Sequence, residues 1–177
     1  PEAGAGSELD QVWPVETPEE TGGEPAIEVA IGDSTMALSE GEVADRKHGC
    51  RHERTSWPEL IGAVNLSCSG AGARTATGLA REAAELSEDT SRVYITVGTN
   101  SLRYGMSSDQ TRKAVTTLAE VISKRAPRAE IVFVGYLTVW ADPECMSDRD
   151  QRIARQVDWL HAEADEIMAD VAKELGA

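Results

Sequence analysis

Long apolar runs are absent from the sequence, and none approaches the roughly 20 residues that a membrane-spanning helix needs. Basic residues are also scarce: 17 Lys and Arg stand against 31 Asp and Glu, giving a formal net charge of -14. Nucleic acids and anionic membrane surfaces attract basic patches, so this balance argues against both as partners. The 177 residues are enough for one domain with a substantial core.

Motifs for metals and cofactors are missing as well. No C-x-x-C occurs, and the three histidines lack the spacing of zinc ligands. The sequence has no Walker A motif, and in Gly70-Ala71-Gly72 a dinucleotide fingerprint fails because Thr75 replaces its third glycine. Residues 32–36 do not read G-x-S-x-G, which excludes the α/β-hydrolase elbow. We therefore expect no metal and no cofactor.

Cysteine occurs only three times, as Cys50, Cys68 and Cys145. The odd number leaves two interpretations open. All three are free thiols in a cytosolic protein, or Cys50 and Cys68 form a disulfide and Cys145 is unpaired. Closing that loop would stabilise the fold by about 3 kcal/mol.

Residues 1–25 contain many acidic residues, prolines and glycines but no Lys or Arg. This composition is typical of a solvated linker or of an extended arm that lies on a domain. We therefore expect the folded domain to span residues 26–177.

Strand and helix patterns alternate along that domain. Such alternation predicts an α/β fold, namely a three-layer α/β/α sandwich with a mostly parallel, flavodoxin-like sheet. The last predicted helix is amphipathic, with Gly176 at its C-cap. Strands are expected at Ala26–Ile31, Val64–Cys68, Arg92–Val97 and Glu130–Val139, and helices at Trp57–Val64, Thr75–Leu86, Ser108–Arg125 and Asp148–Leu175.

Three glycine-bearing turns follow three successive predicted strands. They are Gly32-Asp33-Ser34, Cys68-Ser69-Gly70-Ala71 and Gly98-Thr99-Asn100. Because the carboxyl ends of parallel strands share one edge, the turns should meet there. The Ser34 hydroxyl would be a nucleophile, and Asp33 would brace its turn.

Acyl transfer needs such a hydroxyl together with fixed donors for the oxyanion of the tetrahedral intermediate. The N–H groups of Ser34 and Gly70 and the side-chain amide of Asn100 would form an oxyanion hole with three donors. Removing one such donor raises the barrier by about 3 kcal/mol.

These motifs resemble those of the SGNH (GDSL-type) hydrolase family. Gly32-Asp33-Ser34 looks like its first block, Gly70 like the glycine of its second, and Gly98-Thr99-Asn100 like its third. Ser101 departs from the pattern, since the family usually has Asp after the asparagine. The resemblance covers Ile27 to Leu175 and implies a serine esterase.

The region from Gly49-Cys50-Arg51 through Trp57-Pro58 to Cys68-Ser69-Gly70-Ala71 resembles secreted actinobacterial esterases of this family. The resemblance implies a Cys50–Cys68 disulfide and a secreted or extracytoplasmic protein. The sequence begins at Pro1 without a signal peptide, so an exported protein has lost its signal or follows a membrane segment.

The catalytic base is less clear from the sequence. Asp158-Trp159-Leu160-His161 matches the family's D-x-x-H string, but it lies inside the predicted helix Asp148–Leu175 rather than on a loop. His161 is therefore expected to pack on that helix, with His161 and Asp158 as secondary candidates for the base. His48 and His52 flank Cys50 and are expected at the surface.

The resemblance also predicts a missing C-terminal block, lost through truncation, cleavage or disorder. In the secreted esterases a cysteine after the fourth strand pairs with one near the catalytic histidine, and Cys145 has no such partner here. Tyr136 and Trp140, at the end of the fourth predicted strand, either line an acyl pocket or simply pack.

We therefore predict a monomeric acyl-ester hydrolase or acyltransferase that works through Ser34. Its substrate would be a small-molecule or glycan acyl ester. One alternative is the extracytoplasmic domain of a membrane O-acyltransferase, with the acidic residues 1–25 as the connecting linker. The other is a binding module that keeps the fold but lacks the base.

Overall fold

The computed structural model describes residues 26–37, 43–45, 50, 52–53, 55–137 and 143–176. The predictions for residues 1–25, for His48 and for Trp140 lie outside this part of the chain.

The centre of the fold is a four-stranded sheet with the order β4-β1-β5-β6, in which every neighbouring pair is parallel. Its middle strands contribute apolar side chains to the core: Val29 and Ile31 on β1 and Val93 and Ile95 on β5 are fully buried. The strands are β1 (Ile27–Gly32), β4 (Val64–Asn65), β5 (Thr90–Thr96) and β6 (Glu130–Phe133).

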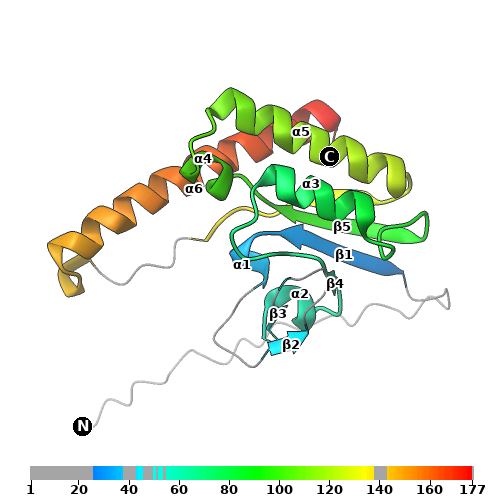
Figure 1. Ribbon diagram of the computed structural model, residues 1–177, viewed down its shortest axis with the longest axis horizontal. Coiled ribbons are helices and arrows are strands. Elements are labelled where there is room, and N and C mark those ends of the chain that lie inside the picture. Colours follow the sequence, from blue (N-terminus) through cyan, green and yellow to red (C-terminus); the bar gives the residue numbers. More distant parts are fainter. Residues whose placement is uncertain are drawn as a thin grey trace, which may run out of the picture.

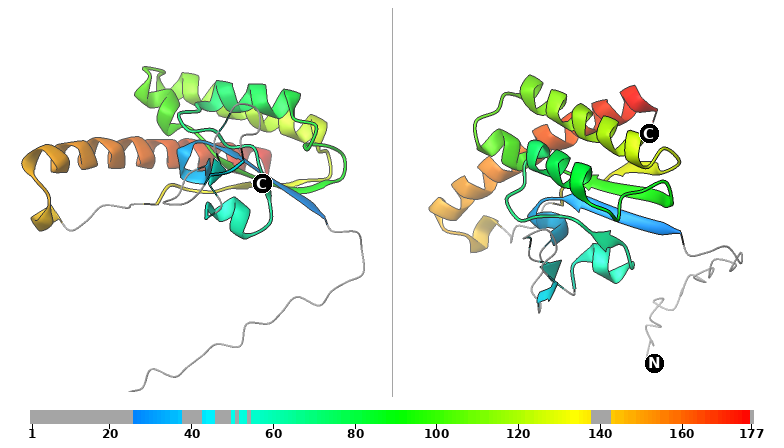
Figure 2. Two further views of the ribbon diagram at one scale, coloured as in Figure 1. Left: turned by 60° about the horizontal axis from the view of Figure 1, so that its bottom comes forward. Right: turned by 45° about the vertical axis from the view of Figure 1, so that its right-hand side comes forward.

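Three helices cover one face of this sheet. They are α3 (Ala73–Glu82), α5 (Ser108–Arg125) and α6 (Asp148–Leu175), and their apolar sides share one core with β1 and β5. Because side chains alternate along a strand, Tyr94 points away from this core, and on the other face it packs edge-on against Trp57 of α2 (Trp57–Leu60). Figures 1 and 2 show α3 and α5 on one side of the sheet and α2 on the other, which confirms the α/β fold.

Capping explains why two helix predictions are correct to the residue. The Ser107 hydroxyl accepts from the Gln110 N–H at 3.2 Å in a capping box that starts α5. Gly176, with φ of +70°, ends α6 in the left-handed region.

Other predicted boundaries are wrong. The helix that begins at Trp57 ends at Leu60, because the chain turns through Gly62 at φ of +76°. The strand that begins at Glu130 ends at Phe133 rather than at Val139. The hairpin β2 (Val43–Asp45) and β3 (His52–Glu53), which is antiparallel, was not predicted, since such short strands have no clear periodicity.

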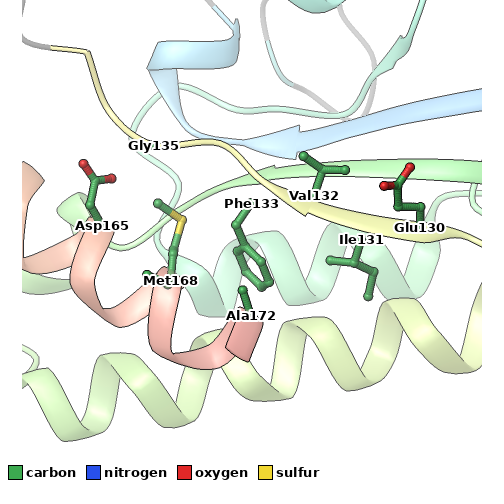
Figure 3. Close-up of a pocket in the computed structure, with 9 residues that line it drawn as sticks. Glu130, Ile131, Val132, Phe133, Gly135, Asp165, Met168 and Ala172 are labelled. Carbon is green, nitrogen blue, oxygen red and sulfur yellow. The ribbon is translucent and has the colours of Figure 1, made fainter. Parts of the chain in front are cut away.

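A groove of about 480 Å³ runs between β6 and α6 (Figure 3). Apolar side chains line its middle, and Asp165 and Glu130 lie toward its two ends. Among the described residues, β6 is the strand at this edge of the sheet. None of the described helices is both long and apolar enough to cross a bilayer.

Candidate active site

The first turn follows β1 and presents Ser34 as the first residue of the short helix α1 (Ser34–Ala37). Gly32 is required here because a Cβ atom would lie 2.6 Å from Met36 Sδ and 2.8 Å from the Thr96 carbonyl oxygen. The Asp33 Oδ1 atom accepts from the Thr35 N–H at 2.9 Å and closes the turn. Ser34 is half-buried at the carboxyl edge of the sheet.

The second turn lies beside the first. The Cys68 N–H donates to the Gly32 carbonyl oxygen at 2.9 Å, and the chain then turns at Gly70, whose φ is +81°. Only glycine adopts this conformation without strain. Within the described residues, the N–H groups of Ser34 and Gly70 donate no hydrogen bond.

The third turn places Asn100 between the other two. Gly98 has φ of +137° and packs so closely on α6 that a Cβ atom would lie 2.8 Å from Ala164 Cβ. Asn100 follows on α4 (Thr99–Arg103) and is only 7% exposed. Its Nδ2 atom donates to the Ala71 carbonyl oxygen at 3.2 Å and to Asp33 Oδ2 at 3.5 Å. Asn100 therefore joins all three turns.

Asp33 is a buried carboxylate, 1% exposed, at the centre of this arrangement. Its Oδ2 atom accepts from the Tyr136 hydroxyl at 2.6 Å. Burial raises the pKa of Asp33, and the hydrogen bonds from Tyr136 and Thr35 partly offset this rise. Burial, followed by the neighbouring Asp33 charge, raises the pKa of Tyr136 well above its ordinary value, so Tyr136 stays protonated and donates.

His161 reaches the same region from α6. Its ring stacks on that of Tyr136, with the ring centroids 4.6 Å apart and the planes 13° from parallel. Its Nδ1 atom is buried without a hydrogen-bond partner among the described residues, and no hydrogen bond joins its ring to the Ser34 hydroxyl. Asp158 lies three residues earlier on α6. The structure therefore places His161 against Tyr136, beside the turn of Asp33, without a hydrogen bond to Ser34.

Two further residues of the site have roles that the sequence did not reveal. The Tyr136 hydroxyl, at a position expected either to line an acyl pocket or to pack, donates a hydrogen bond to Asp33. Ser101, at the position of the family's aspartate, accepts from the Ala73 N–H at 3.0 Å and holds the start of α3. Helix α3 therefore begins two residues before the predicted Thr75. The only sequence feature that indicated a role for Tyr136 in the site was its position at the end of the fourth predicted strand.

A disulfide joins Cys50 to Cys68, with the two Cα atoms 5.0 Å apart, and confirms the pairing that the resemblance implied. Cys145 is a free, exposed thiol. Among the described residues, no three His, Cys, Asp or Glu side chains are grouped so that they could hold a metal ion.

The fold is similar to those of several solved esterases and lipases. An extracellular lipase from Streptomyces rimosus superposes with a TM-score of 0.68 at 20% identity, covering 86% of this chain and 78% of the lipase. For phospholipase A1 from Streptomyces albidoflavus the TM-score is 0.59 at 19% identity, covering 85% and 77%. For a family two carbohydrate esterase from Clostridium thermocellum it is 0.54 at 15% identity, covering 85% and 51%. No curated protein matches the sequence significantly.

The sequence model of the GDSL-like lipase/acylhydrolase family matches residues 30–177. This match includes all three turns and the helix that carries His161. Lipases and acylhydrolases are enzymes that hydrolyse acyl esters. The chain belongs to the GDSL-like lipase/acylhydrolase family.

Proposed function

We propose that this chain hydrolyses carboxylic acyl esters through an acyl-enzyme on Ser34. The observation that supports this best is the Asn100 side chain, whose amide reaches Asp33 Oδ2 at 3.5 Å and the Ala71 carbonyl oxygen at 3.2 Å. One amide thus lies between the nucleophile's turn and the Gly70 turn, where the oxyanion of a tetrahedral intermediate needs a donor.

In the proposed reaction, the Ser34 oxygen attacks the ester carbonyl carbon and its proton passes to a base. The carbonyl oxygen becomes an oxyanion between the N–H groups of Ser34 and Gly70 and the Asn100 amide. Collapse of this intermediate breaks the bond to the alcohol, which leaves with the proton. Water then attacks the acyl-serine by the same route and releases the carboxylic acid.

Asn100 has to redirect one N–H toward the oxyanion. Its contact with Asp33 is long, at 3.5 Å, whereas its contact with Ala71 is shorter, at 3.2 Å. The longer bond is the weaker one, so we propose that this hydrogen turns to the substrate while the Ala71 bond holds the side chain in place.

We propose that the base is a histidine that this chain does not supply, with the Asp158–His161 pair as the alternative. The support is the geometry of His161, which stacks on Tyr136 and makes no hydrogen bond to Ser34 within the described residues. A general base has to come within about 3 Å of the proton that it accepts, so His161 would have to move.

The nucleophile can be tested by p-nitrophenyl acetate hydrolysis with the wild type, Ser34→Ala and Ser91→Ala. Ser91 is the matched control, because its hydroxyl bonds to the Ile27 carbonyl oxygen at the start of β1, the opposite end from Ser34. With imidazole added to replace the missing base, we expect Ser34→Ala to show only the background rate and Ser91→Ala to match the wild type. Equal rates for the wild type and Ser34→Ala would contradict a serine mechanism.

The base is tested with added imidazole, and Ser34→Ala serves as the blank because imidazole itself hydrolyses the ester. If the base is absent, imidazole accelerates the wild type and His161→Ala equally. If His161 is the base, His161→Ala loses activity without imidazole, and imidazole restores the variant while leaving the wild type unchanged.

We propose that the substrate is a small-molecule or glycan ester and that the protein works outside the cytoplasm. The Cys50–Cys68 disulfide supports this location, because disulfides persist in oxidising compartments. The similar folds of an extracellular lipase and a carbohydrate esterase are consistent with both ideas.

A binding module is the second candidate, favoured by the missing hydrogen bond between Ser34 and an imidazole in the described residues. It would hold an ester without turning it over. Binding of an ester analogue without any turnover above Ser34→Ala, even with imidazole, would support this candidate over the enzyme.

A further inference from the structure

We propose that Tyr136 is a positioning residue, which orients the Asn100 amide for the oxyanion by fixing the Asp33 carboxylate. The inference rests on the proposed function and adds a residue outside the three motif turns. Tyr136 lies just beyond β6, which contributes none of those turns.

The Tyr136 hydroxyl connects two of the turns directly. It donates to Asp33 Oδ2 at 2.6 Å, and it accepts from the Thr99 N–H at 3.4 Å. Thr99 immediately precedes Asn100 on α4. One hydroxyl therefore holds both the carboxylate that Asn100 contacts and the backbone that carries Asn100.

The backbone and the ring of Tyr136 are both fixed by contacts with α6. Its backbone N–H donates to Asp165 Oδ1 of α6 at 2.9 Å, and its ring stacks on His161 of the same helix. The side chain is 8% exposed, so little water competes for its hydroxyl. A hydroxyl fixed in this way can set the position of a neighbouring carboxylate.

Asp33 connects the Tyr136 hydroxyl to the Asn100 amide. The same Oδ2 atom accepts from Tyr136 and from Asn100 Nδ2, whereas Oδ1 is occupied by the Thr35 N–H. Without the Tyr136 hydroxyl, the hydrogen bond left to Oδ2 within the described part of the chain is the 3.5 Å contact with Asn100. We expect Asp33 Oδ2 and the Asn100 amide to move closer together, which turns the amide away from the oxyanion.

The experiment compares Tyr136→Phe with Tyr94→Phe in p-nitrophenyl acetate hydrolysis. Tyr94 is the matched control, because its hydroxyl also donates to a carboxylate, Glu28 Oε2 at 2.9 Å, but on the face packed by α2. We expect Tyr136→Phe to lose roughly ten- to hundredfold in kcat with KM nearly unchanged, since small displacements of donors cost that much. Tyr94→Phe should keep the wild-type kcat.

The pH dependence of kcat/KM tests whether Tyr136 acts through Asp33. A general loss of structure would lower kcat/KM without shifting its pH dependence. The Tyr136 hydrogen bond lowers the pKa of Asp33, so its loss raises that pKa. Because a protonated Oδ2 no longer accepts from Asn100, kcat/KM should begin to fall at a higher pH in Tyr136→Phe than in the wild type. Of the ionisable groups around Asp33, Tyr136 faces it from beyond β6 and His161 from α6. The profile is therefore repeated with His161→Gln in both backgrounds, where the shift should persist.

The side-chain amide signals of Asn100 in a ¹H–¹⁵N spectrum test the inference without turnover. We expect them to shift in Tyr136→Phe and to stay in place in Tyr94→Phe. Unchanged amide signals in Tyr136→Phe would overturn the inference, as would wild-type kcat beside an inactive Ser34→Ala. If Ser34→Ala is as active as the wild type, the serine mechanism fails instead, and the amide signals alone then decide whether Tyr136 positions Asn100.

Discussion

At the scale of single residues, the site brings together groups that are costly to bury. Asp33 is 1% exposed, and its nearest partners are neutral donors rather than a Lys or Arg side chain. Neutral donors stabilise a carboxylate less than a paired cation does, and burial accordingly raises the pKa of Asp33. Ionisation of the residue that organises the turns therefore opposes folding.

The stability of Asp33→Asn relative to the wild type should therefore increase as the pH rises, while its esterase activity should be lower. The folded-state pKa of Asp33 lies above its unfolded value of about 3.8, so the charged form opposes folding at high pH. As the pH falls through the folded-state pKa, Asp33 takes up a proton and the wild type recovers this loss.

Urea unfolding of both proteins between pH 4 and 8 checks this prediction, and the advantage of Asp33→Asn should grow as the pH rises. An advantage that is constant over this range, or that grows toward acid, would contradict the assignment of the raised pKa to Asp33.

At the scale of elements, the close approach of β1, α1 and β5 requires glycine at position 32. Helix α3 also contains a glycine, Gly78, but nothing around it requires one. A Cβ atom on Gly32 would meet Met36 Sδ and the Thr96 carbonyl oxygen within 3 Å, but one on Gly78 would meet nothing within 4 Å. Gly78 lies inside α3, where glycine costs about 0.5–1 kcal/mol relative to alanine.

We therefore expect opposite effects from the same substitution. Gly78→Ala should raise the free energy of unfolding by about 0.5–1 kcal/mol, and Gly32→Ala should lower it by about 1–3 kcal/mol through overpacking. Urea unfolding measures both. Equal stability of Gly32→Ala and the wild type would mean that β1 and β5 can separate at this point without cost.

Much of this element arrangement could be predicted because it depends on local signals. The bounds of α5 and α6 follow from Ser107 and Gly176, and the parallel sheet follows from apolar strands that alternate with helices. The three turns were predictable because each glycine is near its functional group. The contact of Tyr136 with Asp33 was not, because 103 residues separate them and only packing brings them together.

At the scale of the whole molecule, the site depends on bonds between distant segments. The Cys50–Cys68 disulfide closes a separation of 18 residues and ties the segment after the nucleophile to the turn that contains Gly70. The Cys68 N–H also donates to the Gly32 carbonyl oxygen at 2.9 Å, so the disulfide includes the residue that joins the Gly70 turn to the end of β1.

Breaking this disulfide should therefore affect both stability and activity. We expect Cys50→Ser to lower the free energy of unfolding by about 3 kcal/mol. The reason is that the unfolded chain gains conformational entropy when a loop of this length is no longer cross-linked. Cys145→Ser is the control and should change it by less than about 0.5 kcal/mol, because Cys145 is exposed and unpaired. Urea unfolding with and without reductant gives the comparison, and reductant should bring the wild type to the level of Cys50→Ser.

The effect on activity is measured separately. If kcat falls in the reduced wild type at temperatures where the protein stays folded, the disulfide fixes the Gly70 turn. If kcat is unchanged there, the disulfide acts on stability alone.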